Sequence, residues 1–124
     1  MKQAEDGILS PHRVLDLTDE RGTLCGKILD ELGADVIKVE PPGGSPARRI
    51  GSFYHDEVNL EKSLPWLSLN TGKRSVCIDI ETADGQAVFR RLAVTADLIV
   101  ELFSPGYMDD RRQMHEPDRA EAAR

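Results

Sequence analysis

The chain has 124 residues, 40% of them hydrophobic and 31% charged, and a formal net charge of −6 at pH 7. These values are typical of one soluble globular domain, and the acidic balance argues against a nucleic-acid-binding protein, which needs a cationic face. The sequence contains neither a signal peptide nor an apolar run of about 18 residues, so we expect no membrane association and a cytoplasmic location.

The spacing of cysteines and histidines does not match the common metal-binding motifs. Cys25 and Cys77 lie far apart in apolar surroundings, which favours buried free thiols over a disulfide. His12, His55 and His115 are scattered, and the chain has no C-x-x-C or H-x-x-H pair. We therefore expect no metal site.

The first third of the chain predicts a β-α-β unit. Residues 13–17 (RVLDL) are typical of a strand, and Thr18-Asp19-Glu20 would cap a helix with acids in its first turn. Gly33 would end that helix, and residues 35–40 (DVIKVE) would form the next strand before a Pro-Pro-Gly-Gly stop. The helix would bury an apolar stripe of Leu24, Ile28 and Leu32, with Cys25 and Leu29 alongside.

A second unit of the same pattern follows. Residues 75–80 form the expected strand, Thr82 or Asp84 the helix cap, and residues 96–101 the returning strand. Its helix would bury Val88, Phe89 and Leu92. Two right-handed units in series predict an α/β, Rossmann-like fold, with a small, mostly parallel sheet and flanking helices.

The domain organisation follows from this pattern. Residues 8–110 form the predicted lobe, and residues 111–124 a polar tail with mixed charges. Residues 41–69 form a long connection that we expect to pack on the domain and to have a function. Two helices do not cover four strands, so we expect some of the apolar area of the strands to stay exposed and to drive self-association or dependence on a partner. The strand residues left to be covered include Ile37, Val39, Ile78 and Ile99.

The stretch Asn70-Thr-Gly-Lys-Arg-Ser-Val, which contains Lys73 and Arg74, resembles the end of a phosphate-binding loop. The resemblance fails, because Leu67 replaces the upstream glycine and a strand rather than a helix follows. The basic pair is then either a solvated turn or a local contact to an anionic ligand.

A dinucleotide site is also a weak hypothesis. The first loop has Gly22-x-x-x-Gly26 instead of G-x-G-x-x-G, so it lacks the glycines that a pyrophosphate requires. Glu40 stands where a ribose-binding acid would be. We expect it instead to pair with Lys38 or Arg48.

Four blocks in order carry a family resemblance: RVLDLT, GTLCGKILDELGADVIKVEPPGGSPAR, LSLNTGKRSVCIDI and ADLIVELFSPGYMDD. They resemble the amino-terminal part of the class III coenzyme A transferases, the CaiB/BaiF type, which include α-methylacyl-CoA racemases. The resemblance implies a lobe that binds the nucleotide end of CoA or acyl-CoA as ligand, without another cofactor. It places CoA contacts at Asp19, Glu20, Arg21, Leu69, Asn70, Lys73, Arg74 and Phe103.

The resemblance also implies what this chain lacks. Pro41, Leu102 and Ser104 replace residues that the family pattern has as Arg, Asn and Arg. The family's nucleophilic aspartate, or the racemases' His and Asp, would lie downstream of the matched blocks, so we assign no catalytic residue. We expect an acyl-CoA transferase- or racemase-like CoA-binding portion that is inactive alone, forming a homo-oligomer or binding another chain. The alternative is a non-catalytic interaction module.

Overall fold

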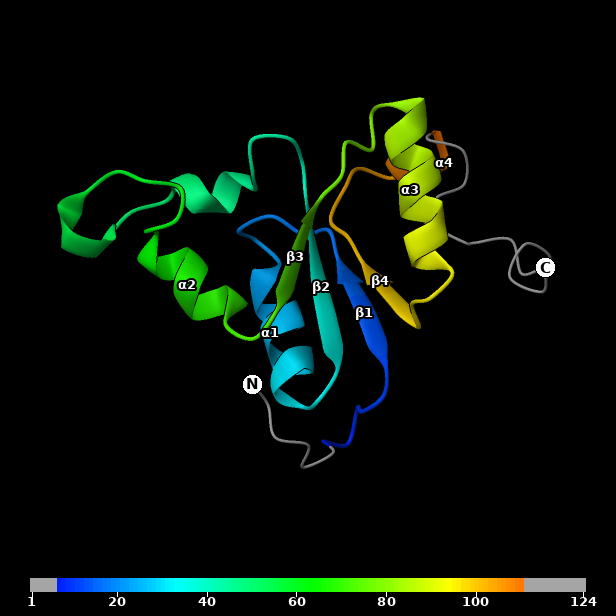
Figure 1. Cartoon of the computed structure of the whole chain (residues 1–124), viewed down its shortest axis with the longest axis horizontal. Helices are drawn as coiled ribbons and strands as arrows, with labels where there is room; N and C mark the ends of the chain where they lie inside the picture. Colours follow the sequence, from blue (N-terminus) through cyan, green and yellow to red (C-terminus); the bar gives the residue numbers. More distant parts are fainter. Residues whose placement is uncertain (1–6, 111–124) are drawn as a thin grey trace.

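The computed structural model describes residues 7–110, so the predicted tail, 111–124, lies outside the described residues. Its strands β1 (Arg13–Asp16), β2 (Asp35–Glu40), β3 (Arg74–Cys77) and β4 (Leu98–Val100) form a sheet in the order β3-β2-β1-β4. Every pairing is parallel, which confirms the predicted α/β fold. Because β3 and β4 are the two edges, the second β-α-β unit crosses the whole sheet (Figure 1).

Two helices cover opposite faces of this sheet. Helix α1 (Thr23–Glu31) connects β1 to β2, and helix α3 (Ala83–Ala93) connects β3 to β4. Side chains alternate between the faces of a strand. Thus Val14 packs in a cluster with Leu29 of α1, whereas Leu15 packs in a larger cluster with Phe89 of α3. The α3 face therefore holds the main apolar core.

The long connection contains two 3-10 segments, η1 (Pro46–Arg49) and η2 (Tyr54–Asp56), and helix α2 (Leu64–Asn70). Its base packs on the domain as predicted, since α2 contacts α1 and Arg48 pairs with Glu40 at the end of β2. Within the connection, Trp66 is buried under the Arg48 guanidinium, 4.1 Å from the ring centroid. Its outer part, around η2, extends away from the sheet (Figure 1). A last short helix, α4 (Tyr107–Asp110), follows β4.

The predicted start of the first helix is wrong. Helix α1 begins at Thr23 after Gly22, which makes no side-chain cap. Thr18 does not cap the helix, because its amide and hydroxyl both donate to the Asp16 carboxylate instead, at 2.9 and 2.6 Å. Thr82 and Gly33 behave as predicted, because Thr82 caps α3 through the Gly85 amide and Gly33 has a φ of +106°.

The apolar stripe of α1 is exposed rather than buried. Leu24, Ile28 and Leu32 are 54%, 48% and 40% exposed. The residues that α1 buries are Thr23, Gly26 and Asp30. The Thr23 hydroxyl donates to the Asp19 carbonyl, and Gly26 lies against Asp16 and Lys73. Cys25 and Cys77 are free thiols as expected, but both are exposed, so the prediction of burial is wrong.

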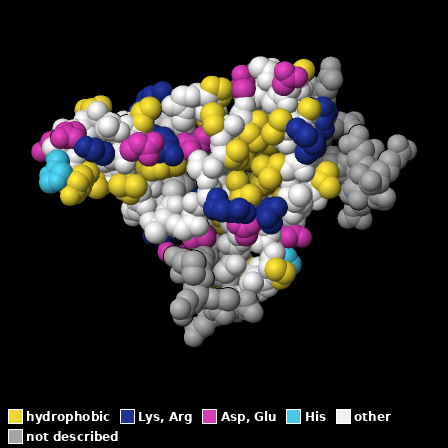
Figure 2. Space-filling view, in the orientation of Figure 1, with side chains coloured by type: hydrophobic (Ala, Val, Ile, Leu, Met, Phe, Trp, Pro, Cys, Tyr) yellow, Lys and Arg dark blue, Asp and Glu magenta, His cyan; other side chains and the backbone are white. Residues whose placement is uncertain are grey.

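The expectation that strand residues stay uncovered is also wrong at three positions. Ile37, Val39 and Ile78 are 7%, 6% and 6% exposed, because the segments after β3 and β4 join α3 in covering them. Figure 2 still shows hydrophobic side chains gathered in the middle of one face, with Lys and Arg groups beside them. Within residues 7–110 no helix is long and apolar enough to cross a bilayer.

Candidate ligand-binding cavity at the carboxyl ends of the strands

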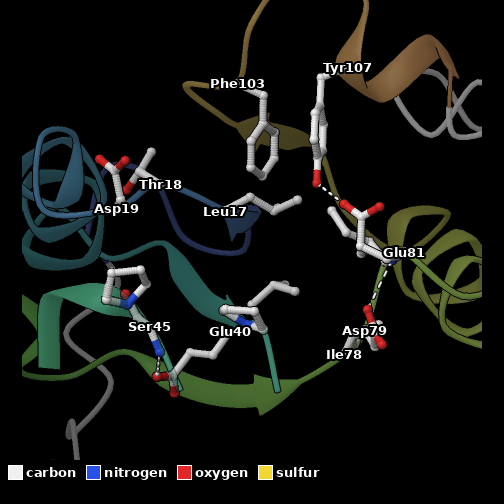
Figure 3. A pocket seen from close by; sticks show the side chains of 14 residues that line it. Leu17, Thr18, Asp19, Glu40, Ser45, Ile78, Asp79, Glu81, Phe103 and Tyr107 are labelled. Carbon is white, nitrogen blue, oxygen red and sulfur yellow. Dashed lines mark hydrogen bonds between the residues drawn. The ribbon is translucent and has the colours of Figure 1, made fainter. Parts of the chain in front are cut away.

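The segments that follow the four strands surround a cavity of about 240 Å³ (Figure 3). The carboxyl edge of an open parallel sheet is where α/β proteins bind ligands. Pockets that enclose a whole drug-sized ligand measure about 300–1,000 Å³. This cavity therefore has room for one part of a large ligand rather than for all of it. Its lining residues are Leu17, Thr18, Asp19, Val39, Glu40, Pro41, Ser45, Pro46, Ile78, Asp79, Ile80, Glu81, Phe103 and Tyr107.

One wall of the cavity is aromatic. The rings of Phe103 and Tyr107 are stacked, with centroids 4.3 Å apart and planes inclined by 20°. The Tyr107 hydroxyl donates to Glu81, which comes from the segment after β3 (Figure 3). With Leu17 and Ile78 opposite, this wall gives the cavity apolar surfaces suited to a flat ring.

The charged groups that line the cavity are all acidic. They are Asp19, Glu40, Asp79 and Glu81, and neither lysine nor arginine is among the lining residues in the described part of the chain. A phosphate inside the cavity would meet only like charge. Hydroxyl and amino groups of a ligand, in contrast, would find carboxylate acceptors there.

Glu40 is held by its neighbours and is not free to bind a ribose. Its Oε1 accepts the Ser45 amide at 2.9 Å and Arg48 Nε at 2.6 Å, and its Oε2 accepts Arg48 Nη2 at 2.9 Å. Ser75 Oγ also donates to Oε2. This confirms the expected pairing of Glu40 with Arg48, and the pair ties η1 to the end of β2.

Asp19 and Arg21 form a second pair at the cavity rim. Arg21 donates through Nε and Nη2 to the two carboxylate oxygens of Asp19, at 3.0 and 2.7 Å. The hydrogen bond from Arg21 is the main cause that lowers the pKa of Asp19. The Arg21 side chain is 68% exposed. Its remaining N–H groups could thus meet an anion outside the cavity.

Lys73 lies in a different environment from the one expected of a phosphate ligand. Its side chain is 1% exposed, and Nζ donates to Asp16 Oδ2 at 2.8 Å, Asn70 Oδ1 at 3.0 Å and the Thr23 carbonyl at 3.0 Å. In this arrangement the ammonium has no open side. Arg74 lies toward the opposite edge of the sheet, where Nη2 pairs with Asp35 at 2.6 Å.

The remaining predicted contacts form a second, smaller hollow. Glu20, Leu69 and Asn70 lie together beside Trp66, around about 20 Å³ of space between the β1 loop and α2. Of the eight predicted residues, the structure therefore places Asp19 and Phe103 in the cavity. Arg21 is not a lining residue but pairs with Asp19, which is one. Glu20, Leu69 and Asn70 line the smaller hollow, and Lys73 and Arg74 line neither space.

The predicted CoA contacts left out several residues that line the cavity. Tyr107 and Glu81 belong to separate segments, and only the parallel order of the strands brings them together. The signal available was positional, since both follow predicted strands closely. Within residues 7–110 no group of three or more His, Cys, Asp or Glu side chains could hold a metal ion.

Comparison with known proteins defines this lobe further. Residues 9–122 match the profile of CoA-transferase family III. The chain is 46% identical over 100 residues to the succinyl-CoA:(R)-benzylsuccinate CoA-transferase subunit BbsE of Thauera aromatica, covering 81% of this chain and 24% of that protein. It is 44% identical over 102 residues to the "probable fatty acyl-CoA transferase Rv3272" of Mycobacterium tuberculosis, covering 82% and 25%.

Solved structures agree with this. The crystal structure of Rv3272 superposes with a TM-score of 0.76 at 39% identity, covering 94% of this chain and 30% of that one. A CaiB/BaiF family protein from Brucella suis gives a TM-score of 0.75 at 33% identity, covering 86% and 29%. The chain thus spans about a quarter of the length of its curated relatives.

Fold and site together define an α/β lobe with a ligand cavity at the carboxyl edge of a parallel sheet. The chain belongs to CoA-transferase family III and corresponds to the amino-terminal part of its members.

The Glu40 pair makes a testable prediction about stability and pH. Burial alone would raise the pKa of Glu40, but hydrogen bonds from Arg48, the Ser45 amide and Ser75 lower it from 4.5 to about 2. A carboxyl group whose pKa is lowered in the folded state stabilises the fold at pH values above its unfolded pKa. This stabilisation is lost as the pH falls from about 4.5 through about 2. At about 1.4 kcal/mol per pKa unit, we expect the pair to contribute ~3 kcal/mol at neutral pH.

Urea unfolding of the parent and of Glu40→Gln would measure this contribution. The parent should be more stable at neutral pH, and the gap in unfolding free energy should narrow as pH falls from about 4.5 toward about 3, because Glu40 of the unfolded chain takes up a proton in this range while folded Glu40 stays charged. Glu57→Gln is the matched control, because its side chain is 62% exposed and pairs only with Lys62 among the ion pairs of residues 7–110. A gap that does not change with pH would contradict the assignment.

Proposed function

We propose that this chain is the CoA-binding lobe of an acyl-CoA transferase and that the cavity receives the adenosine end of the ligand. The observation that carries the proposal is the stacked pair of Phe103 and Tyr107 above an apolar floor, at the carboxyl edge of the sheet. A base stacked on an aromatic ring gains about 1–3 kcal/mol. The family membership supports CoA as the source of that base.

Charge decides which part of CoA can enter. Since the lining carries four carboxyl groups, the proposed orientation keeps the phosphates outside and places the base and sugar inside. Arg21 is the cation that we assign to a phosphate outside the cavity, because it pairs with the cavity residue Asp19 and its side chain is largely exposed. The relatives above are described as CoA-transferases, so we propose acyl-CoA transfer rather than racemisation for the whole protein.

Calorimetry with CoA tests the proposed orientation. Phe103→Ala should weaken CoA and adenosine by a similar factor of about 10, because both lose the stacking contact. Arg21→Met should weaken CoA by about 10-fold and leave adenosine unchanged, because a charge-assisted contact contributes ~1.5–3 kcal/mol. Phe53→Ala is the aromatic control, because Phe53 lies in the connection between β2 and β3 and does not line the cavity. Equal affinity of CoA for the parent and Phe103→Ala would refute the stacked site.

We further propose that the 124-residue chain by itself does not turn over acyl-CoA. Acyl transfer of this class needs a carboxylate nucleophile against the thioester carbonyl. Four carboxylates from the matched blocks are engaged in the structure. Asp16 binds two lysines, Glu40 binds Arg48, Asp79 accepts the Glu81 amide at 3.1 Å, and Glu101 accepts the Phe103 amide at 2.6 Å.

Incubation of the pure chain with acyl-CoA donors and carboxylate acceptors checks this, alongside deuterium incorporation into a chiral 2-methylacyl-CoA. We expect neither CoA transfer nor exchange. Activity that disappears on substitution of Asp16, Glu40, Asp79 or Glu101 by the corresponding amide would show that the active site lies within this lobe. A cytoplasmic location stays a prediction of the sequence.

A second copy of the chain is the partner that we propose for α1. The exposed stripe of Leu24, Ile28 and Leu32 needs an apolar cover. Lys27 and Glu31 flank it one turn apart, with Nζ and Oε1 3.8 Å from each other. Two such helices packed antiparallel about a two-fold axis would set Lys27 of each copy near Glu31 of the other. This favours self-association over an unrelated partner.

Sedimentation velocity over a range of concentrations measures the association. We expect the parent chain to dimerise and Leu24→Gln plus Ile28→Gln to stay monomeric, with an unchanged circular dichroism spectrum, because these side chains are exposed in the monomer. Val88→Gln is the control, since Val88 is 42% exposed on α3. A parent chain that is monomeric at all concentrations would rule out this interface.

A further inference from the structure

Three charged side chains from distant parts of the chain meet beneath α1, and we call them the buried ion cluster: Asp16, Lys38 and Lys73. Asp16 ends β1, Lys38 lies in β2 and Lys73 precedes β3. Their side chains are 0%, 1% and 1% exposed. None of the three lines the cavity. A buried charge is costly unless it is paired and hydrogen-bonded, so this group requires an explanation.

Both ammonium groups have a full set of partners. Lys38 Nζ donates to Asp16 Oδ1 at 3.2 Å, to Thr18 Oγ1 at 3.3 Å and to the Thr18 carbonyl. Lys73 Nζ donates to Asp16, Asn70 and the Thr23 carbonyl, at 2.8, 3.0 and 3.0 Å. An ammonium has three N–H donors. A ligand phosphate would have to displace one of these partners.

The hydrogen-bond partners of the two lysines lie in the loop after β1, at the start of α1 and at the end of α2. Thr18 is held at its amide and hydroxyl by Asp16 and at its carbonyl by Lys38. Lys73 connects the same Asp16 to the turn at Asn70 and to the first residue of α1, Thr23. The cluster thus fixes both ends of the loop 18–22 and links it to the end of α2, where other predicted ligand contacts lie.

Helix α1 is packed directly on the cluster. A Cβ added at Gly26 would collide with Asp16 Oδ2 and lie 2.9 Å from Lys73 Nζ. The close approach excludes larger side chains and keeps the ions in a dry site. Burial alone would raise the pKa of Asp16, but Lys38 and Lys73 outweigh it and lower the pKa, so the carboxylate stays charged.

We propose that the buried ion cluster positions the β1 loop for ligand binding, and that Lys73 acts as a positioning residue rather than as a phosphate ligand. This role rests on the proposed function, because the loop carries Asp19 at the cavity and Arg21 at its rim. One carboxylate holds two cations, so removal of either lysine leaves a balanced pair and should leave the chain folded.

Lys38→Met and Lys73→Met test the role, with Lys27→Met as the control from the surface of α1. Hydrogen exchange at the Thr18 amide, measured by NMR, should accelerate at least about 10-fold in Lys38→Met and remain at the parent rate in Lys27→Met. Thr18→Val, which removes only the hydroxyl, is the milder variant if a methionine variant does not fold. It should accelerate the same amide by a smaller factor. Exchange of the Thr18 amide at the parent rate in both Lys38→Met and Thr18→Val would overturn the positioning role.

Ligand selectivity separates positioning from direct contact. If Lys73 positions the loop, Lys73→Met should weaken CoA, 3′-dephospho-CoA and ADP by a common factor of about 10. A loss confined to CoA would instead show direct contact between Lys73 and the 3′-phosphate, which would overturn the proposal. Should the parent bind none of these ligands, the proposed function fails, and amide exchange alone decides whether the cluster holds the loop.

Discussion

The carboxylate of Asp16 is the constraint on which the polar half of this lobe depends. It ends the central strand β1, it is fully buried, and it accepts hydrogen bonds from Lys38, Lys73 and Thr18. Loss of Asp16 would leave Lys38 and Lys73 buried without a counter-charge, and removal of one partner from a buried ion pair typically costs about 3–5 kcal/mol. The cluster therefore sets the position of β2, the turn before β3 and the start of α1 together.

The two faces of the sheet have different roles as a result. The α3 face holds the apolar core around Leu15 and Phe89, which are both 0% exposed, and this supplies most of the hydrophobic stabilisation. The α1 face buries charge and sets the loop after β1. Hydrophobic stabilisation and the geometry of the loop after β1 thus come from different faces of the sheet. Several residues of this core also line the cavity, among them Leu17, Val39 and Ile78, so a substitution there would change both the free energy of unfolding and the shape of the cavity.

Sequence patterns predicted what depends on local chemistry. The strands, the Thr82 cap and the Glu40–Arg48 pair follow from β-branched runs, a capping residue and nearby opposite charges. Patterns failed where a residue's partner is far along the chain. Lys73 stands between Gly72 and Arg74, like an exposed turn residue, and only the folded sheet brings it to Asp16. Periodicity likewise identified the apolar stripe of α1 but could not say that no other part of residues 7–110 covers it.

The same distribution of charge bears on how an acidic chain can hold an anionic ligand. Lys38 and Lys73 are buried and share the Asp16 carboxylate, Arg48 is paired with Glu40, and none of the three lines the cavity, so they add little attraction there. In the proposed site, affinity would come from stacking and from hydrogen bonds to the uncharged base and sugar, with Arg21 near Asp19 for the phosphates. Such a site should depend only weakly on salt, because few exposed ion pairs contribute to binding. It would hold one end of CoA and leave the thioester end outside the lobe, where catalytic groups from another part of a full-length relative could reach it.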